Sequence, residues 1–424
     1  MKLDSYWLDT APAGIQASEG PVEGHVDVAV IGGGFTGLSA ALALGKRGAT
    51  VAVLDAGRVG GGASGRNGGQ CNTGVAQDYA ALREQLGVER AQGCYRAYAA
   101  AVDTVERLIR EERIDCDYLA SGKLKLAAKP RHLEHLEHTA ELISREVDPD
   151  VEIIARERIR SEVESDCFYG GLLQKRGGQM HMGKFAVGLA NAAALRGARI
   201  FEHAAVTSIE KDHGAWRIES ARGTLRAHQV LIATGPSRHG PFAWYRRRLA
   251  PVGSFIVVTE PLPANQLARL LPKRRSYTTS RLMHNYFRVT SDSRLLFGGR
   301  ARFTASERPS DAKSGRILQA SLAQMFPSLA GARIDYCWGG LVDITADRLP
   351  RAGQHDGVYF SMGYSGHGTQ MSTHMGQAMA EVIGGNAAAN PWRDFDWPAI
   401  PGHTGKPWFL PLVGAYFQIK DIFY

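Results

Sequence analysis

The feature that most constrains this chain is a glycine-rich turn between two apolar segments, with the spacing G-x-G-x-x-G at Gly32, Gly34 and Gly37. Residues 26–31 and 50–54 are apolar and β-branched, which predicts strands, and the residues between them place apolar side chains at helical spacing. The order of strand, turn, helix and strand predicts a βαβ unit.

The same turn has the chemistry of a dinucleotide site. Glycines let the backbone approach a pyrophosphate closely, and the helix N-terminus offers free N–H groups and the positive end of a dipole. Asp55 ends the second strand and can accept hydrogen bonds from ribose hydroxyls. An ordinary glycine turn needs none of these neighbours, so we predict that an adenine dinucleotide binds here. The motif alone does not separate FAD from NAD.

A second glycine-rich segment, RVGGGASGRNGGQ at residues 58–70, follows the acid almost directly. Such a segment can be a loose surface loop. Its position beside the ribose acid instead favours a second loop that contacts phosphate and ring, because exposed amides and small side chains let a planar cofactor lie close.

Composition limits the class of protein. The 424 residues allow two or three domains, and lysine and arginine exceed the acids by 8. Short basic runs such as WYRRRL suit a solvated surface or attraction of anionic ligands better than a nucleic-acid or membrane partner. The five cysteines include no C-x-x-C pair, which predicts no metal site and a reducing compartment. No leader or long apolar run is evident, so we expect a cytoplasmic protein without a transmembrane segment.

Further along the chain, helical and strand-like segments alternate. Helical spacing covers residues 80–113, 184–196 and 370–383, whereas residues 204–235 predict a β-meander that returns to the nucleotide-binding sheet. This interleaving, without a clean linker, predicts two domains that are each built from several segments.

The segment GGGASGRNGGQ at residues 60–70, following a βαβ unit, resembles the D-amino acid oxidase-like family of FAD-dependent amine and amino-acid oxidoreductases. VLIATG at residues 230–235 and GYSGHGTQMS at residues 363–372 follow in the family's order, and the resemblance spans nearly the whole chain. It is greatest to the branch that contains γ-glutamylputrescine oxidoreductases. The resemblance implies an α/β (α+β mixed) fold, in which a Rossmann-like FAD-binding domain is joined to a substrate domain with a large mixed β-sheet.

We expect both domains to be discontinuous. The FAD-binding domain is expected at residues 1–75, 180–240 and 335–424, and the substrate domain at residues 76–179 and 241–334.

The resemblance also implies a set of residues in contact with FAD, along the pyrophosphate, the adenosine, the ribityl chain and the flavin. These are Gly32, Gly34, Phe35, Thr36, Asp55, Ala56, Arg58, Ala63, Ser64, Asn67, Gly68, Gly69, Gln70, Val206, Thr234, Gly235, Gly366, His367, Gly368, Thr369 and Gln370.

Attachment of the cofactor is expected to be non-covalent. Some relatives bind FAD through a cysteine before the last glycine loop, but the aligned position here is Gly340, and Cys337 lies three residues away. We expect Cys71 and Cys337 to be packed thiols.

Candidate catalytic or substrate-binding residues are Tyr286, Arg288, Arg351 and His367, with His284 beside the first two. If residues 285–289 form a strand, Tyr286 and Arg288 point to one face, and an arginine there can bind a carboxylate. The alternatives are a packed tyrosine, solvated arginines and a purely structural His367. His181 is expected to be a packing residue.

The resemblance implies oxidation of a C–N bond in a small-molecule amine or amino acid to an imine, by hydride transfer to flavin, with oxygen or another electron acceptor reoxidising it. The favoured substrate is a γ-glutamylputrescine-type aliphatic amine. L-pipecolate or another secondary amino acid, and a role as the flavin-binding accessory subunit of a multi-subunit dehydrogenase, remain alternatives. The loop at residues 60–70 argues against an NAD dehydrogenase, and hydrolase motifs are not apparent.

Overall fold

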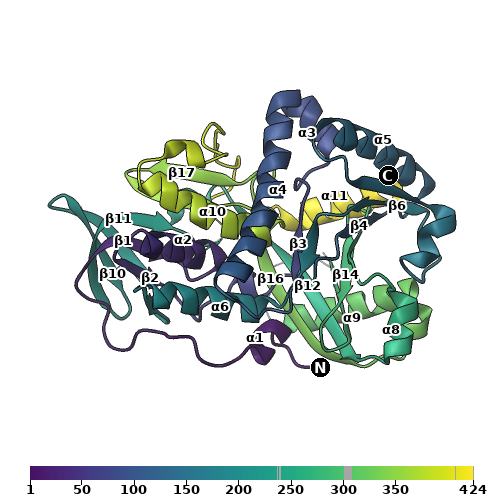
Figure 1. Cartoon of the computed structure of the whole chain (residues 1–424), viewed down its shortest axis with the longest axis horizontal. Helices are drawn as coiled ribbons and strands as arrows, with labels where there is room; N and C mark the ends of the chain where they lie inside the picture. Colours follow the sequence, from purple (N-terminus) through teal and green to yellow (C-terminus); the bar gives the residue numbers. More distant parts are fainter. Residues whose placement is uncertain (236, 238–239, 300–307, 406, 424) are drawn as a thin grey trace.

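A computed structural model describes residues 1–424 of the chain except 236, 238–239, 300–307, 406 and 424. Two eight-stranded sheets dominate the described part, and each carries its own helices (Figure 1). The chain passes between the sheets several times, as the interleaved sequence pattern predicts.

The first sheet is built around the predicted βαβ unit. Strand β1 (His25–Ile31) pairs in parallel with β2 (Val51–Leu54) on one side and with β11 (Gly223–Ile232) on the other. The inner part of β1 and all of β2 are buried, which is why these strands are continuous apolar runs rather than alternating ones. The outer strands are β8 (Arg199–Phe201), β18 (Val358–Met362) and β17 (Arg351–His355).

The meander predicted at residues 204–235 is confirmed. Strands β9 (Val206–Asp212) and β10 (Ala215–Ser220) form an antiparallel hairpin, and β10 continues the pairing onto β11. The last strand then returns in parallel beside β1, so its carboxyl end reaches the same edge of the sheet as the glycine turn.

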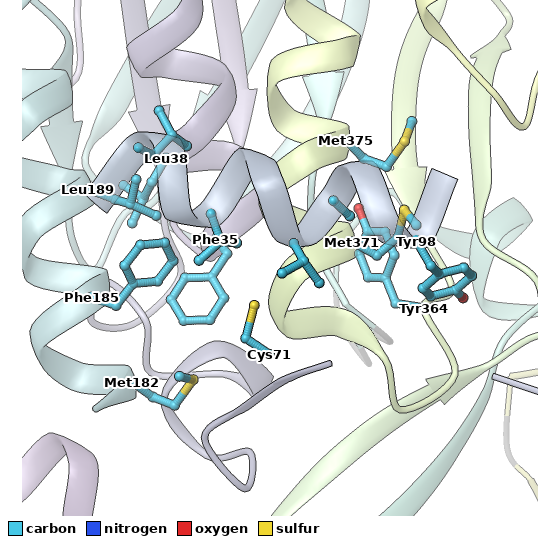
Figure 2. Close-up of a cluster of buried hydrophobic side chains, with 14 of the residues drawn as sticks. Phe35, Leu38, Cys71, Tyr98, Met182, Phe185, Leu189, Tyr364, Met371 and Met375 are labelled. Carbon is cyan, nitrogen blue, oxygen red and sulfur yellow. The ribbon is translucent and has the colours of Figure 1, made fainter. Parts of the chain in front are cut away.

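Helices α2 (Phe35–Lys46), α6 (Met182–Leu195) and α10 (Gly368–Ile383) pack together beside this sheet, with α4 (Val88–Glu111) against α10. Residues 35–44 of α2 are all buried, because the helix lies between α6 and α10. Figure 2 shows the resulting core, in which Phe35 and Phe185 meet edge to face at 5.1 Å. Small residues dominate α2, and they allow these close approaches.

The second sheet is mixed and lies on the other side of the molecule (Figure 1). Five strands run antiparallel to their neighbours, β13 then pairs in parallel with β4, and two further antiparallel strands complete the sheet. In order they are β16 (Ile334–Ile344), β12 (Ala250–Pro261), β15 (Arg294–Gly299), β14 (Asn285–Val289), β13 (Ser276–Thr279), β4 (Lys123–Leu126), β6 (Gly170–Gln174) and β5 (Val151–Ala155). Helix α9 (Arg308–Met325) packs on β12 and β16.

Shorter elements connect and cover the sheets. The remaining helices are α1 (Tyr6–Thr10), α3 (Tyr79–Leu86), α5 (Pro130–Glu146), α7 (Ala243–Arg246), α8 (Ala264–Leu270) and α11 (Leu410–Phe423), and the remaining strands are β3 (Gln70–Asn72) and β7 (Gly177–Gln179). Within the described ranges, no helix combines the length and the apolar character that crossing a bilayer requires.

We retain the division into two discontinuous domains as a proposal. Strand β16 pairs with β12 along its length, so it belongs with the second sheet although it begins close to the expected boundary at residue 335. The proposed boundary therefore moves to the end of β16.

Candidate active site

A cavity of about 1480 Å³ is lined by residues of both sheets. On one side it is lined by Ile31, Leu54 and Ala233, which stand at the carboxyl ends of β1, β2 and β11. Ligands of open α/β sheets bind at this edge. On the other side the cavity is lined by residues of the second sheet, including Tyr286 of β14.

In the glycine turn, backbone atoms approach one another more closely than side chains would allow. Gly32 has a φ of +115°, and a Cβ there would lie 2.7 Å from the carbonyl oxygen of Ala233. A Cβ at Gly37 would lie 1.9 Å from the carbonyl oxygen of Gly32. Only glycine satisfies both positions, and the N-terminus of α2, with Phe35 and Thr36, consequently lines the cavity.

Asp55 is held at the rim of the same turn. Its carboxylate accepts hydrogen bonds from the backbone N–H groups of Gly33 at 2.7 Å and Gly57 at 2.8 Å. Burial raises the pKa of this carboxyl above its ordinary value, against the opposing effect of the two donors. Asp55 is thus a fixed acceptor beside the glycine turn, where the sequence predicts a ribose contact.

The second glycine loop is hydrogen-bonded to the segment that follows the glycine turn. Ser64 Oγ accepts a hydrogen bond from the Phe35 N–H at 3.0 Å, so the loop rests against the start of α2. The Asn67 side chain stabilises the loop from within, because its Oδ1 accepts from the Gly69 N–H at 2.8 Å and its Nδ2 donates to the Ser64 carbonyl at 2.8 Å.

Carbonyl groups of this loop accept hydrogen bonds from side chains of distant segments. Ser5 Oγ donates to the Gly65 carbonyl at 2.6 Å, and Trp7 Nε1 donates to the Asn67 carbonyl at 2.7 Å. From β16, Trp338 Nε1 donates to the Arg66 carbonyl at 2.9 Å. The loop is therefore an ordered surface and not a loose connection.

The third predicted segment, at the N-terminus of α10, meets the second glycine loop. Thr369 Oγ1 donates to Asn67 Oδ1 at 3.3 Å, and Gln370 Nε2 donates to the Asn72 carbonyl at 2.6 Å. These bonds place the positive end of the α10 dipole on the cavity, where it favours negative charge on a bound group.

His367 stands at this junction. Its ring packs edge to face on Tyr98 at 5.9 Å, and burial, followed by the charges of Lys123 and Arg348, lowers its pKa well below the ordinary range. The imidazole is therefore neutral at physiological pH.

Tyr286 lines the cavity beside the second glycine loop. A Cβ at Gly68 would lie 2.7 Å from the Tyr286 ring, and the Tyr286 hydroxyl shares a hydrogen bond with Ser254 Oγ at 3.1 Å. This candidate and His284 both face the cavity.

Most residues expected to contact FAD line this cavity. They are Gly32, Gly34, Phe35, Thr36, Asp55, Ala56, Ala63, Ser64, Asn67, Gly68, Gln70, Val206, Thr234, Gly235, Gly366, His367, Gly368, Thr369 and Gln370. Two expected residues do not line it. Arg58 is exposed beyond the turn, and Gly69 is buried behind the loop, where a Cβ would lie 2.8 Å from the Met180 carbonyl oxygen.

Arg288 is placed away from the cavity although it shares a strand face with Tyr286. It is 3% exposed, donates to the Met180 carbonyl at 2.9 Å and to Gln179 Oε1 at 3.2 Å, and lies over the Trp7 ring at 4.9 Å. The guanidinium therefore supports the segments behind the glycine loop and does not line a substrate pocket.

Arg351 is also withdrawn from the cavity. It is 4% exposed, forms an ion pair with Asp347, and donates to the carbonyls of Leu349, Pro350 and Asp396 at 3.0 Å. Its donors are occupied by the protein, so this placement gives no support to an anion clamp.

The remaining expectations concern packing residues. His181 caps α6 by accepting from the Lys184 N–H at 3.2 Å, and burial lowers its pKa to about 4. Cys71 and Cys337 are buried free thiols, as predicted. Gly340 lines the cavity, and a Cβ there would lie 3.1 Å from Arg66 Cβ.

Several cavity residues were missed by sequence reasoning. The most prominent are Lys123 and Lys125 of β4, Arg348 after β16, and the buried Asp343. A signal for the first two is present, because K-L-K-L at residues 123–126 alternates as a half-buried strand does.

The cavity fits FAD. Its volume exceeds that of ordinary small-ligand pockets, the glycine turn leaves room for a pyrophosphate, and two buried polar atoms in it, His367 Nδ1 and Asn72 Oδ1, lack hydrogen-bond partners among the described residues. Such atoms are rare in proteins unless a ligand or water satisfies them.

Comparison with known proteins identifies relatives over nearly the whole chain. The family model FAD dependent oxidoreductase (DAO) matches residues 27–382. Gamma-glutamylputrescine oxidoreductase of Escherichia coli (strain K12) is 34% identical over 407 residues, covering 93% of this chain and 92% of the relative. Glycine oxidase of Bacillus licheniformis is 28% identical over 380 residues, covering 86% and 95%. The crystal structure of glycine oxidase from Geobacillus kaustophilus superposes with a TM-score of 0.70 at 22% identity, covering 88% of this chain and all of that chain.

Proposed function

Because the chain belongs to the DAO family of FAD-dependent oxidoreductases, we propose that it oxidises the C–N bond of an amine to an imine, with a γ-glutamylputrescine-type aliphatic amine as substrate. The observation that carries this proposal is the continuity of one cavity from Asp55 and the glycine turn to Tyr286 and the second sheet. A cofactor held at the first end leaves room for a substrate at the second.

FAD supplies the two-electron acceptor when it is bound, and the protein supplies position and electrostatics. The turn at Gly32 and the N-terminus of α2 would hold the phosphates, and Asp55 would hold the ribose. Thr369, Gln370 and the dipole of α10 favour negative charge at the ring end of the cofactor.

Apolar side chains line one wall of the cavity. Phe409, Leu410, Val413 and Phe417, from α11 and the residue before it, line the cavity. Neutral His367 and the Tyr286 ring provide further uncharged surface near the glycine loops. These uncharged groups do not protonate a bound amine, and the amine nitrogen must be unprotonated for its neighbouring carbon to be oxidised.

Substrate reduction of the flavin under anaerobic conditions tests the proposal. The FAD-loaded protein is mixed with γ-glutamylputrescine, putrescine, L-pipecolate or glycine, and the loss of visible flavin absorbance is followed. We expect γ-glutamylputrescine to bleach the flavin fastest. Bleaching by L-pipecolate or glycine alone would show that the substrate is an amino acid. A protein that takes up no FAD would refute the proposed function.

Turnover by the isolated chain separates a self-sufficient enzyme from an accessory subunit. We expect repeated turnover with oxygen or an artificial dye as electron acceptor. Reduction that stops after a single turnover with every acceptor would favour the accessory role.

A further inference from the structure

Strand β4 presents two lysines to the cavity. Lys123 and Lys125 alternate with Leu124 and Leu126, which are fully buried on the opposite face of the sheet. Both lysines line the cavity and are only partly exposed. The pleat of one strand thus places two ammonium groups on the same wall.

Arg348 brings a third cation to this wall. It lines the same cavity, and its charge lowers the pKa of Lys125, in addition to the larger effect of burial. Burial is the largest cause of the lowered pKa of His367, and the charges of Lys123, Arg348 and Lys125 lower it further. All three cations and His367 line the same cavity.

Their charges are not neutralised by carboxylates. Throughout the described ranges, no ion pair joins an acid to Lys123, Lys125 or Arg348. Asp78 raises the pKa of Lys125, but its carboxylate is engaged by the backbone N–H groups of Ala80 and Ala81 at 3.1 and 3.3 Å and by His135 at 3.0 Å. Burial, followed by the charge of Lys125, lowers the pKa of Lys123 to about 8, so a bound anion would stabilise the charged form of this lysine.

The cofactor's phosphates do not account for this cluster. The glycine turn and the N-terminus of α2, on the first sheet, already provide a phosphate site, whereas the lysines project from the second sheet. The cluster is therefore placed for a second anion, on the substrate side.

We propose that Lys123, Lys125 and Arg348 form a subsite that binds the carboxylate of the substrate and makes the enzyme prefer amines that carry an acidic group. The inference rests on the proposed function, because it assigns these residues to the substrate of that reaction. Charge-assisted hydrogen bonds from lysine and arginine are the interactions that carboxylates form most strongly in proteins.

Binding of glutarate, a dicarboxylate that has no amine to oxidise, tests the subsite without turnover. Glutarate is titrated into the FAD-loaded protein by calorimetry. We expect measurable binding to wild type and a loss of about tenfold or more in Lys123→Met/Lys125→Met, because two charged donors are removed. Lys123→Arg/Lys125→Arg keeps the charge and is expected to retain most of the affinity.

The control is Lys211→Met, at an exposed lysine of β9 outside the cavity, which should bind glutarate as wild type does. Flavin content and circular dichroism confirm that each variant is folded. Titration with inorganic phosphate distinguishes the anion, and tighter binding of phosphate than of glutarate would overturn the carboxylate assignment.

Kinetics provide the second readout. In the double methionine variant, KM for γ-glutamylputrescine should rise about tenfold or more while kcat changes little, and kcat/KM for putrescine, which lacks the carboxylate, should not fall. Equal losses with both amines, or unchanged glutarate binding, would overturn the inference and leave the proposed function standing. If no amine reduces the flavin yet glutarate binding depends on the lysines, the proposed reaction fails and the anion subsite stands.

Discussion

Gly376 of α10 lies so close to Thr36 of α2 that a Cβ at position 376 would stand 2.4 Å from the Thr36 carbonyl oxygen. Both helices contribute their N-termini to the cavity lining, α2 at the glycine turn and α10 beside the second glycine loop. Their contact at Gly376 fixes the distance between the two N-termini, and it depends on the missing side chain.

The first prediction is that Gly376→Ala weakens both the fold and cofactor binding. The new methyl group must push α10 away from α2, which we expect to lower the free energy of unfolding by about 1 to 3 kcal/mol. Urea unfolding and FAD titration of the apoprotein measure the two effects. Gly93→Ala on the exposed face of α4 has no atom within 4 Å of its Cβ and should be neutral or slightly stabilising. Equal behaviour of both variants would contradict the steric explanation.

A second prediction concerns attachment of the cofactor. The resemblance predicts that Gly340 takes the place of the cysteine that binds FAD in some relatives, and in the structure Gly340 lines the cavity without offering a nucleophile. Acid or heat denaturation should therefore release FAD into the supernatant. Flavin fluorescence that remains on the denatured polypeptide in a gel would show that the cofactor is covalently bound.

The third prediction tests whether Arg288 supports the second glycine loop or binds the substrate. Arg288→Met removes the donors to Met180 and Gln179 and the contact with Trp7, so we expect a loss of about 2 to 4 kcal/mol in stability. Thermal unfolding measures this, with exposed Arg316→Ala as the control. KM for γ-glutamylputrescine should stay within about twofold of wild type in the folded fraction. A large rise in KM with unchanged stability would restore Arg288 as an anion clamp.

The fourth prediction is a pH dependence of stability that arises from Asp343. Burial raises the pKa of this carboxyl to about 6 from an ordinary value of 3.8, although it accepts a hydrogen bond from the Gly363 N–H at 2.7 Å. Between these two values the folded protein binds the proton more tightly than the unfolded chain does. The stabilisation from protonated Asp343 is therefore complete below about pH 4 and is lost as the pH rises through about 6.

Asp343→Asn removes this titration and keeps an acceptor for the Gly363 N–H. The difference in Tm, wild type minus variant, should decrease as the pH rises from about 4 to about 6 and should be constant above about pH 7. Asp150→Asn, at an exposed carboxyl, should show no such step. A difference that does not change with pH would contradict the assignment to Asp343.

Local sequence was sufficient to predict which glycine-rich segments meet at the cavity. The glycine spacing, Asp55 and the loops at residues 60–70 and 366–370 depend on short-range geometry, and the structure brings all of them to one cavity. The order of elements likewise predicted the first sheet, because a βαβ unit leaves few alternatives for parallel pairing.

The substrate side was not predictable to the same degree. Sequence alternation correctly placed Tyr286 and Arg288 on one face of β14, but it does not specify what covers each position. Tyr286 faces the cavity, whereas Arg288, two residues later, packs against Gly69 and the Trp7 ring, away from the cavity. The lysines of β4 face the cavity because of pairing with β13 and β6, which are distant in sequence.

The first ten residues contact both halves of the molecule and the second glycine loop. Lys2 forms a β-bridge with Tyr336 of β16, and the carbonyl of Trp7 packs against Gly183 of α6. The Trp7 indole donates a hydrogen bond to the Asn67 carbonyl in the second glycine loop. Heating should therefore melt both sheets in one cooperative calorimetric transition. Release of FAD should coincide with that transition, because the loop that cradles the cofactor cannot keep its shape after either half has come apart.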